Sequence, residues 1–250
     1  MVTRWYLKVV TFLIQWLSPA TLERIILRAL YESAKRVPAE EALFFMFRLD
    51  AALYSIEGQM ALAYGERVHP KHRLIGYHKY FISRIGASDR VIDVGCGTGA
   101  VAYDIAKETG AVVDGVDYNP KNIELARQLF VHPNVNFIEG DALNYKFGRS
   151  YNIVILSNVL EHIDERSEFL GQLIKRTRAD KFLIRVPIFE RDWRVALRRE
   201  LGLEWRLDLD HKIEYSVESF LQETIDAGLI VRHLEVRWGE IWSELTVVDD

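Results

Sequence analysis

The spacing of apolar and polar positions changes along this chain and divides it into a helical N-terminal part and a longer alternating part. Between residues 5 and 17 the polar side chains recur every three to four positions, which predicts a helix with a narrow polar stripe and a wide apolar arc. A second amphipathic helix is predicted over 21–34, and a third, strongly apolar one over 39–64, with Gly58 as a candidate interruption. These helices form a predicted N-terminal extension, residues 1–70.

From Arg90 onward, short apolar runs alternate with helical patterns. Strands are predicted at 90–94, 111–116, 135–138, 151–156, 181–186, 229–236 and 241–248. Helices begin near Thr98, Pro120, Glu165 and Ser216, with Thr98 and Ser216 as caps and Pro120 as a first helical residue. This alternation predicts a doubly wound α/β domain over 71–250 with a mainly parallel sheet. Residues 188–212 are too long for an ordinary connection and are predicted to be an inserted lid.

The first predicted strand leads into a glycine loop, Asp93-Val94-Gly95-Cys96-Gly97-Thr98-Gly99. A dinucleotide-binding loop has the form G-x-G-x-x-G, whereas this chain has G-x-G-x-G preceded by an acid. A carboxylate at that position repels a pyrophosphate and suits a cationic ligand. S-adenosylmethionine carries an ammonium and a sulfonium, so Asp93 favours it over a dinucleotide.

Two further acids follow the second and third predicted strands. Asp117 can accept hydrogen bonds from both ribose hydroxyls of a nucleoside, and Asp141 with the N–H of Ala142 can hold an adenine edge. Asp93, Asp117 and Asp141 therefore lie at one carboxyl edge of the predicted sheet, where ligands bind in such folds.

This combination of loop and acids resembles the class I S-adenosylmethionine-dependent methyltransferases. The resemblance implies a Rossmann-like, seven-stranded sheet whose last strand is antiparallel, with S-adenosylmethionine as the cofactor. It implies cofactor contacts from Asp93, Gly95, Cys96, Gly97, Gly99, Asp117, Tyr118, Asp141, Ala142 and Asn158. A nucleotide-binding fold with another cofactor is the alternative.

The segment after the fourth predicted strand, Asn158-Val159-Leu160-Glu161-His162-Ile163, is similar to that of small-molecule methyltransferases, including relatives of the ubiquinone O-methyltransferases. His162 is a candidate general base, because the unperturbed imidazole pKa is near neutral; a structural histidine is the alternative. Glu161 and His162 could belong to a metal site, but no further ligand pattern accompanies them, so no metal is predicted.

His211 is the second candidate for base catalysis or acceptor binding. The pattern His-x-x-x-Tyr-Ser ahead of an amphipathic helix is similar to glycan- and lipid-modifying methyltransferases. A helix-capping network of His211 with Asp210 and Tyr215 is the alternative. The predicted lid carries five arginines and two tryptophans, which suit an anionic or sugar-bearing acceptor; a solvated charged loop is the other interpretation. The basic segment 67–79 is either a lid that contacts the cofactor carboxylate or an anionic substrate, or a solvated face.

Composition and charge narrow the classes of function. The net charge of −4 argues against a nucleic-acid partner, and the single cysteine, Cys96, excludes an intrachain disulfide. The run 5–17 is shorter than the about 20 apolar residues of a membrane span and lacks a secretory cleavage site. We expect a cytoplasmic protein. Residues 1–18 either pack on the protein's own core or on a partner, or contact a membrane surface.

These observations together predict a methyltransferase acting on an oxygen of a small-molecule, glycan or lipid-linked acceptor. Methylation of a protein or nucleic acid is one alternative. A cofactor-binding subunit without turnover is another. The pattern indicates no particular oligomeric state.

Overall fold

The computed structural model describes residues 8, 10–65, 70–145 and 147–248. They form two compact units, residues 1–61 and 62–250, and each is described by itself.

The N-terminal unit is helical. Residues 10–14 are helical, α2 spans Pro19–Ala34 and α3 spans Ala39–Tyr64. The Ser18 hydroxyl caps α2 by accepting the Thr21 N–H at 3.2 Å. Because α3 runs through Gly58, the expected interruption there is wrong; flanking helix formers outweigh the roughly 1 kcal/mol cost of one glycine.

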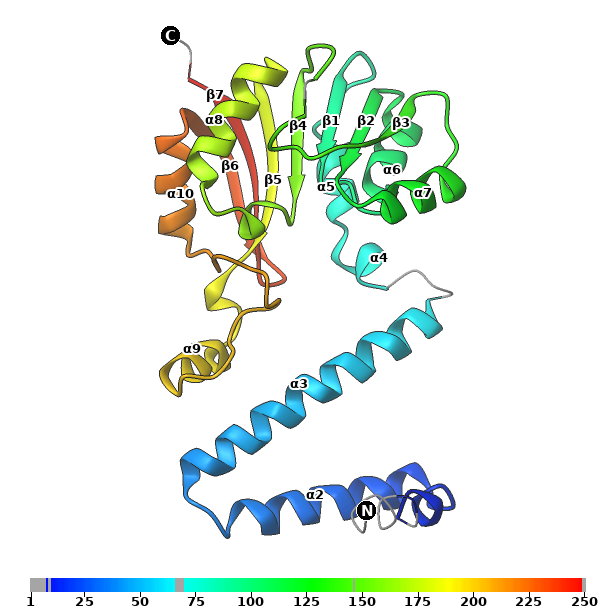
Figure 1. The fold of residues 1–250 in the computed structure, drawn as a ribbon, viewed down its shortest axis with the longest axis vertical. Coiled ribbons are helices and arrows are strands. Elements are labelled where there is room, and N and C mark those ends of the chain that lie inside the picture. Colours follow the sequence, from blue (N-terminus) through cyan, green and yellow to red (C-terminus); the bar gives the residue numbers. More distant parts are fainter. Residues whose placement is uncertain (1–7, 9, 66–69, 146, 249–250) are drawn as a thin grey trace. The chain divides into compact units, whose positions relative to one another are not determined.

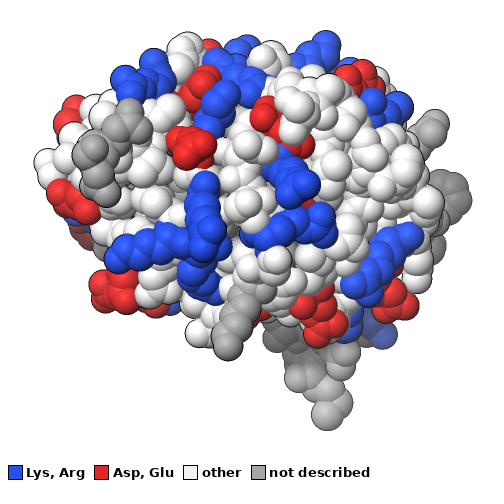
Figure 2. Space-filling view, turned by 90° about the horizontal axis from the view of Figure 1, so that it is seen from above, with Lys and Arg blue, Asp and Glu red and all other residues white. Residues whose placement is uncertain are grey.

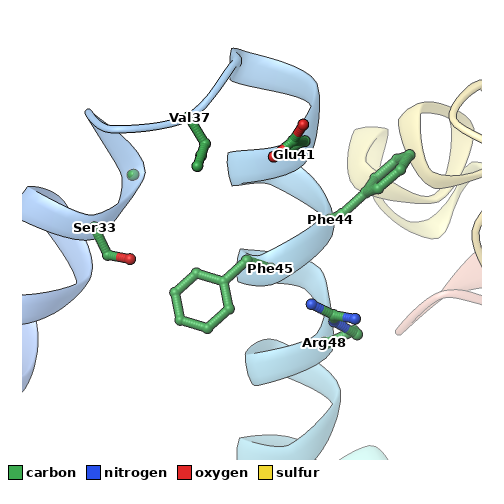
Figure 3. Close-up of a pocket in the computed structure, with 7 residues that line it drawn as sticks. Ser33, Val37, Glu41, Phe44, Phe45 and Arg48 are labelled. Atoms are coloured by element: carbon green, nitrogen blue, oxygen red, sulfur yellow. The ribbon is translucent and has the colours of Figure 1, made fainter.

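A hollow of about 300 Å³ lies between the end of α2 and the first turns of α3. In Figure 3, Ser33, Val37 and Phe45 point into the space between the two helices. It is lined by Ser33, Ala34, Val37, Glu41, Phe44, Phe45 and Arg48.

Large apolar side chains of this unit are exposed to an unusual extent. Trp16 is 76% exposed and Tyr54 is 72% exposed, and the same holds for many aliphatic side chains of α2 and α3. Among the described residues, no helix is both long and apolar enough to cross a membrane.

A seven-stranded sheet forms the centre of the larger unit, in the order β3-β2-β1-β4-β5-β7-β6 (Figure 1). The first five strands are parallel, and β7 is antiparallel to both of its neighbours. The predicted doubly wound fold and its antiparallel last strand are therefore confirmed. The strands are β1 Arg90–Val94, β2 Val112–Asp117, β3 Val135–Glu139, β4 Ile153–Ser157, β5 Lys181–Pro187, β6 Leu229–Arg237 and β7 Glu240–Val247.

Helices cover both faces of the sheet, because side chains along each strand alternate between two apolar clusters. Ile92 and Val94 of β1 pack with α8 and α10, whereas Val91 packs with α5, α6 and α7 on the opposite face. The helices are α4 Lys71–Ile75, α5 Tyr77–Ile82, α6 Ala100–Thr109, α7 Pro120–Leu129, α8 Arg166–Thr177, α9 Trp193–Glu200 and α10 Val217–Asp226, with short 3₁₀ turns at Leu160–His162 and Phe189–Arg191.

Two of the three predicted helix-start signals are confirmed. Pro120 is the first residue of α7, and Ser216 forms a capping box with Ser219 at the start of α10. Thr98 is not a cap, because α6 begins at Ala100 after Gly99, whose φ of +86° favours glycine. A Cβ on Gly99 would lie 2.5 Å from the Phe137 ring, so this glycine also allows α6 to approach the sheet.

The face seen from above in Figure 2 carries basic and acidic side chains interspersed. Elsewhere in the larger unit, Arg149 and the buried Asp114 form an ion pair at 3.3 Å.

Candidate active site at the carboxyl edge of the sheet

The glycine loop folds from β1 across the end of β2. The N–H groups of Gly95 and Cys96 both donate to the carbonyl of Val116, at 2.8 and 3.0 Å. Gly97 has a φ of +54°, and a Cβ built there would meet no atom within 4 Å. The backbone at Gly97 therefore borders open space, as a loop that receives a ligand requires.

Asp93 is buried at the end of β1, and its Oδ2 has no hydrogen-bond partner among the described residues. Burial, reinforced by the charge of nearby Asp117, raises the pKa of Asp93 to about 7. A buried carboxylate with a free oxygen fits a cationic group, and the sulfonium and ammonium of S-adenosylmethionine provide two.

Asp117 organises the loop from the end of β2. Its Oδ2 accepts the Gly97 N–H at 2.9 Å, while its Oδ1 accepts the Asn119 N–H at 2.8 Å and the Asn122 side-chain amide at 3.2 Å. The carboxylate thus has a fixed orientation beside Gly97. Its expected ribose contact stays a prediction.

The residues expected at the adenine lie on the next loops. Asp141 is exposed after β3, and its carboxylate accepts the Leu143 N–H at 3.0 Å and the Asn144 amide at 2.8 Å. It therefore holds its own turn, in which Ala142 is the next residue. Tyr118 is largely exposed directly after Asp117.

Cys96 turns its side chain toward the sheet. Its Sγ lies 3.0 Å from the position that a Cβ of Gly115 would take. Burial raises the pKa of the thiol, with a smaller contribution from the charges of Asp93 and Asp117. Cys96 is therefore not suited to a nucleophilic role. It acts as a small side chain that packs the glycine loop against β2.

Asn158 joins two residues that the sequence analysis missed. Its Oδ1 accepts the Arg185 Nε–H at 2.9 Å, and its φ of +57° is one that asparagine tolerates. The Arg185 guanidinium lies 3.7 Å from the centre of the Tyr77 ring. The sequence does contain a signal for this contact. Arg185 lies within the apolar run 181–187, and a buried guanidinium needs partners.

Glu161, His162 and His211 meet beyond β4. One ligand atom from each of the three lies within 4.8 Å of the others, and the two imidazole centres are 4.7 Å apart. His211 is buried, whereas the His162 side chain is 34% exposed. The structure thus brings both candidate bases to one place, although they are far apart in the sequence.

Glu214 holds His211 in place. Its Oε1 lies 2.9 Å from His211 Nδ1 and its Oε2 lies 2.6 Å from Arg191 Nη1. Burial alone would lower the pKa of His211, but the hydrogen bond to Glu214 and the charge of Glu161 outweigh it, and the pKa is raised. The expected capping network of His211 with Asp210 and Tyr215 is not what the structure has, because His211 bonds Glu214.

The inserted segment is fastened at its base. All three bonds join backbone atoms. The N–H of Ile188 donates to the carbonyl of Gly239 at 3.0 Å, and the N–H of Phe189 donates to the carbonyl of Tyr215 at 2.7 Å. The N–H of Lys212 donates to the backbone carbonyl of Glu161 at 2.6 Å. Several arginines of the segment already have local partners, including Arg194 with Asp192 and Arg206 with Glu204. Arg199 lies over the rings of Phe189 and Trp205.

The described part of the basic segment 67–79 is also engaged within the fold. Tyr77 hydrogen-bonds His72, and His78 Nδ1 lies 2.6 Å from Asp104 Oδ2. Tyr77 lies next to Arg185. Residues 67–69 of the segment are outside the described residues.

Residues 91–180 match the family described as "Methyltransferase domain". The chain is 30% identical over 134 residues to the ubiquinone biosynthesis O-methyltransferase of Rickettsia bellii, covering 53% of this chain and 55% of that protein. It is 29% identical over 91 residues to norajmaline N-methyltransferase of Rauvolfia serpentina, covering 34% and 31%. The chain therefore spans about half, or less, of the length of these curated relatives.

Among solved structures, magnesium protoporphyrin IX methyltransferase of Synechocystis with bound S-adenosylhomocysteine superposes with a TM-score of 0.57. The two share 18% sequence identity, over 72% of this chain and 84% of that one. At that identity the likeness concerns the fold.

Proposed function

We propose that this chain, which belongs to the class I S-adenosylmethionine-dependent methyltransferases, transfers a methyl group to an oxygen of a small or lipid-linked acceptor. The observation that carries the choice of oxygen is the meeting of His162 and His211 at the sheet edge that also holds the glycine loop. A hydroxyl acceptor must lose a proton during methyl transfer, and the two histidines are the groups that can remove it.

The residues present fit the cofactor. The open space above Gly97 leaves room for the ligand against the backbone, and the free oxygen of Asp93 suits a positive charge. Asp117 would hold the ribose, Asp141 with Ala142 the adenine edge, and Asn158 would border the site beside Arg185. When bound, S-adenosylmethionine supplies a methyl group on a sulfonium.

The chemical step is an in-line displacement. The acceptor oxygen would form a bond to the methyl carbon as the carbon–sulfur bond breaks with its electron pair left on sulfur, and His162 would take the hydroxyl proton. This chain must orient the acceptor, exclude water and stabilise the oxygen as it loses its proton. His162 is partly exposed and His211 is anchored through Glu214, so His162 faces the acceptor and His211 supports it.

The names of two relatives indicate different acceptors, so methylation of nitrogen is the alternative to methylation of oxygen. The name of the Rickettsia relative supports an oxygen acceptor of the quinone type, whereas the Rauvolfia relative is named for N-methylation. An amine acceptor that is already neutral needs no base, so the histidine cluster favours the hydroxyl.

Turnover with matched acceptors tests the proposal. We expect conversion of S-adenosylmethionine to S-adenosylhomocysteine with a phenolic quinol and little with the corresponding amine. His162→Ala should lower kcat by about 10²–10⁴-fold while leaving binding of S-adenosylhomocysteine unchanged. Turnover with the amine alone, or cofactor binding without turnover on either acceptor class, would contradict it.

A membrane surface is the proposed location of the acceptor. The exposed apolar side chains near the N-terminus, among them Phe12, Leu13 and Trp16, support this proposal, because an apolar helix face can lie in the membrane interface. Residues 1–7 and 9 of the proposed contact region lie outside the described residues.

A further inference from the structure

Glu161 is buried, yet neither oxygen of its carboxylate has a hydrogen-bond donor among the described residues. Leaving a buried carboxylate without partners is costly, so such a group either holds a proton or faces a cation. No lysine or arginine ion pair reaches it in the described part of the chain, whereas the buried carboxylate of Glu214 has both Arg191 and His211.

A second carboxylate lies near each of the two imidazoles next to Glu161, and it orients His211 through a hydrogen bond. His211 Nδ1 bonds Glu214 at 2.9 Å, which leaves Nε2 as the nitrogen available to a ligand. His162 Nδ1 lies 3.1 Å from Asp210 Oδ2, although not in hydrogen-bond geometry. Histidines that bind metal ions are commonly held in this way, because the outer carboxylate fixes the ring and makes the ligating nitrogen more basic.

We infer that Glu161, His162 and His211 bind one divalent metal ion. This inference rests on the proposed function, whose acceptor site it specifies. Donors about 2.1 Å from one ion lie at most about 4.2 Å apart, and the three ligand atoms are already within 4.8 Å of one another. A small rotation of the side chains closes the difference.

The donor set indicates the class of ion. Two imidazole nitrogens and one carboxylate oxygen suit Zn²⁺, Co²⁺, Fe²⁺ or Mn²⁺, whereas Mg²⁺ and Ca²⁺ favour oxygen donors. Three protein ligands leave at least one coordination position open, as catalytic rather than structural sites do. The exposed side of His162 is where that open position would meet the acceptor.

The metal ion changes the part played by the histidines. Coordination of the acceptor oxygen lowers the pKa of its hydroxyl, the proton passes to solvent, and the oxygen keeps the electron pair that forms the bond to the methyl carbon. The imidazoles are then ligands rather than bases, and Glu161 supplies negative charge that offsets the ion.

Metal binding can be measured on the full-length chain without acceptor or cofactor. The protein is stripped with chelator, dialysed and titrated with Co²⁺, followed by its visible absorption and by calorimetry. We expect one ion per chain, and at least 10-fold weaker binding in Glu161→Gln and in His162→Ala. The matched control is His233→Ala, because His233 is a partly exposed histidine on β6.

Circular dichroism establishes that each variant is folded, and His162→Ala is the milder change because its side chain is partly exposed. Wild-type Co²⁺ binding no tighter than that of a folded Glu161→Gln variant would overturn the inference. Methyl transfer that persists in chelator would overturn it as well, while leaving the proposed function standing. Tight Co²⁺ binding without any methyl transfer would overturn the proposed function alone.

Discussion

Asp93 and Asp117 are two carboxylates at the ends of neighbouring strands, and the structure treats them differently. Asp117 accepts three hydrogen bonds and fixes the loop, whereas Asp93 keeps one oxygen without a donor. A carboxylate that already accepts three hydrogen bonds can still accept a hydroxyl of a neutral ligand, while an unsatisfied buried carboxylate is stabilised by a cation. We therefore expect Asp117 to suit a ribose and Asp93 to suit a positive charge.

If Asp117 holds the ribose as proposed, Asp117→Ala should weaken binding of S-adenosylhomocysteine by about 2–3 kcal/mol, because charge-assisted hydrogen bonds would be lost. Isothermal titration calorimetry measures the change. Asp226→Ala, at an exposed carboxylate at the end of α10, is the matched control and should bind as the wild type does. Equal affinity in the Asp117 variant would show that the ribose is held elsewhere.

Asp93 should make both stability and cofactor affinity depend on pH. Its pKa is about 7 in the folded state and 3.8 ordinarily, so the folded state binds the proton more tightly. The stability that this proton contributes is complete below pH 4 and is lost as the pH rises to about 7.

Urea titrations of the wild type and Asp93→Asn measure this effect, because the asparagine does not titrate. The wild type should lose stability relative to the variant between pH 4 and 7. Affinity for S-adenosylmethionine should change in the opposite sense and rise toward pH 7, because the cation favours the charged carboxylate. A constant difference in stability across that range would mean that Asp93 does not titrate there.

At the scale of elements, the local spacing of residues predicted most of the strands and the loop between β1 and α6. Short apolar runs and alternating glycines are visible within a few positions, so they require no knowledge of the fold. The pairing of His162 with His211 was not predictable in this way, because it depends on the path of the inserted segment. The start of α6 at Gly99 instead of Thr98 was also not predictable from local spacing. The contact of Gly99 with Phe137 arises only when α6 packs on the sheet.

Gly99→Ala should reduce the free energy of unfolding by roughly 2–4 kcal/mol, from backbone strain at φ +86° and the clash with Phe137. Gly171→Ala provides the control, because a Cβ at Gly171 in α8 meets no atom within 4 Å. That change should stabilise the protein by about 0.5–1 kcal/mol. Urea unfolding of both variants distinguishes them by sign, and a neutral Gly99→Ala would refute close packing of α6.

The Arg191–Glu214–His211 chain connects the inserted segment to the strand edge. Arg191→Met should cost about 3 kcal/mol, because it removes the arginine partner of the buried Glu214 and leaves only His211. Arg194→Met is the comparison, since its pair with Asp192 is partly exposed and should cost less than about 1 kcal/mol. Thermal unfolding of the two variants measures the difference, and equal losses would count against a structural role for the Arg191 pair.

At the scale of the whole molecule, two units of different character share one chain. The larger unit buries two apolar clusters on either side of its sheet, whereas the N-terminal unit exposes many of its large apolar side chains. A large exposed apolar area commonly marks an interaction site, which supports the proposed membrane contact. The sequence pattern predicted the helices but not what covers their apolar surface, because a wide apolar arc is equally compatible with internal packing.

Replacing Phe12 and Trp16 together by Glu should abolish co-sedimentation with liposomes of anionic phospholipid, because both side chains are exposed and apolar. Leu129→Glu, at an exposed apolar position of α7, should leave co-sedimentation unchanged. Binding of S-adenosylhomocysteine should be the same in all variants. If the unaltered chain does not sediment with liposomes, the membrane contact is wrong.

The hydrogen bonds that fasten residues 188 and 189 to 239 and 215 close the inserted segment at its base. A loop closed in this way resists lengthening only weakly, since each doubling of its length costs about 0.6 kcal/mol in closure entropy. Its tip can therefore gain or lose residues over evolutionary time while the strands beneath it keep their register. The glycine loop has no such freedom, because its turn is fixed by Val116 and Asp117. If the inserted segment binds the acceptor as proposed, chains with this fold should diverge first in the acceptor and last in the methyl donor.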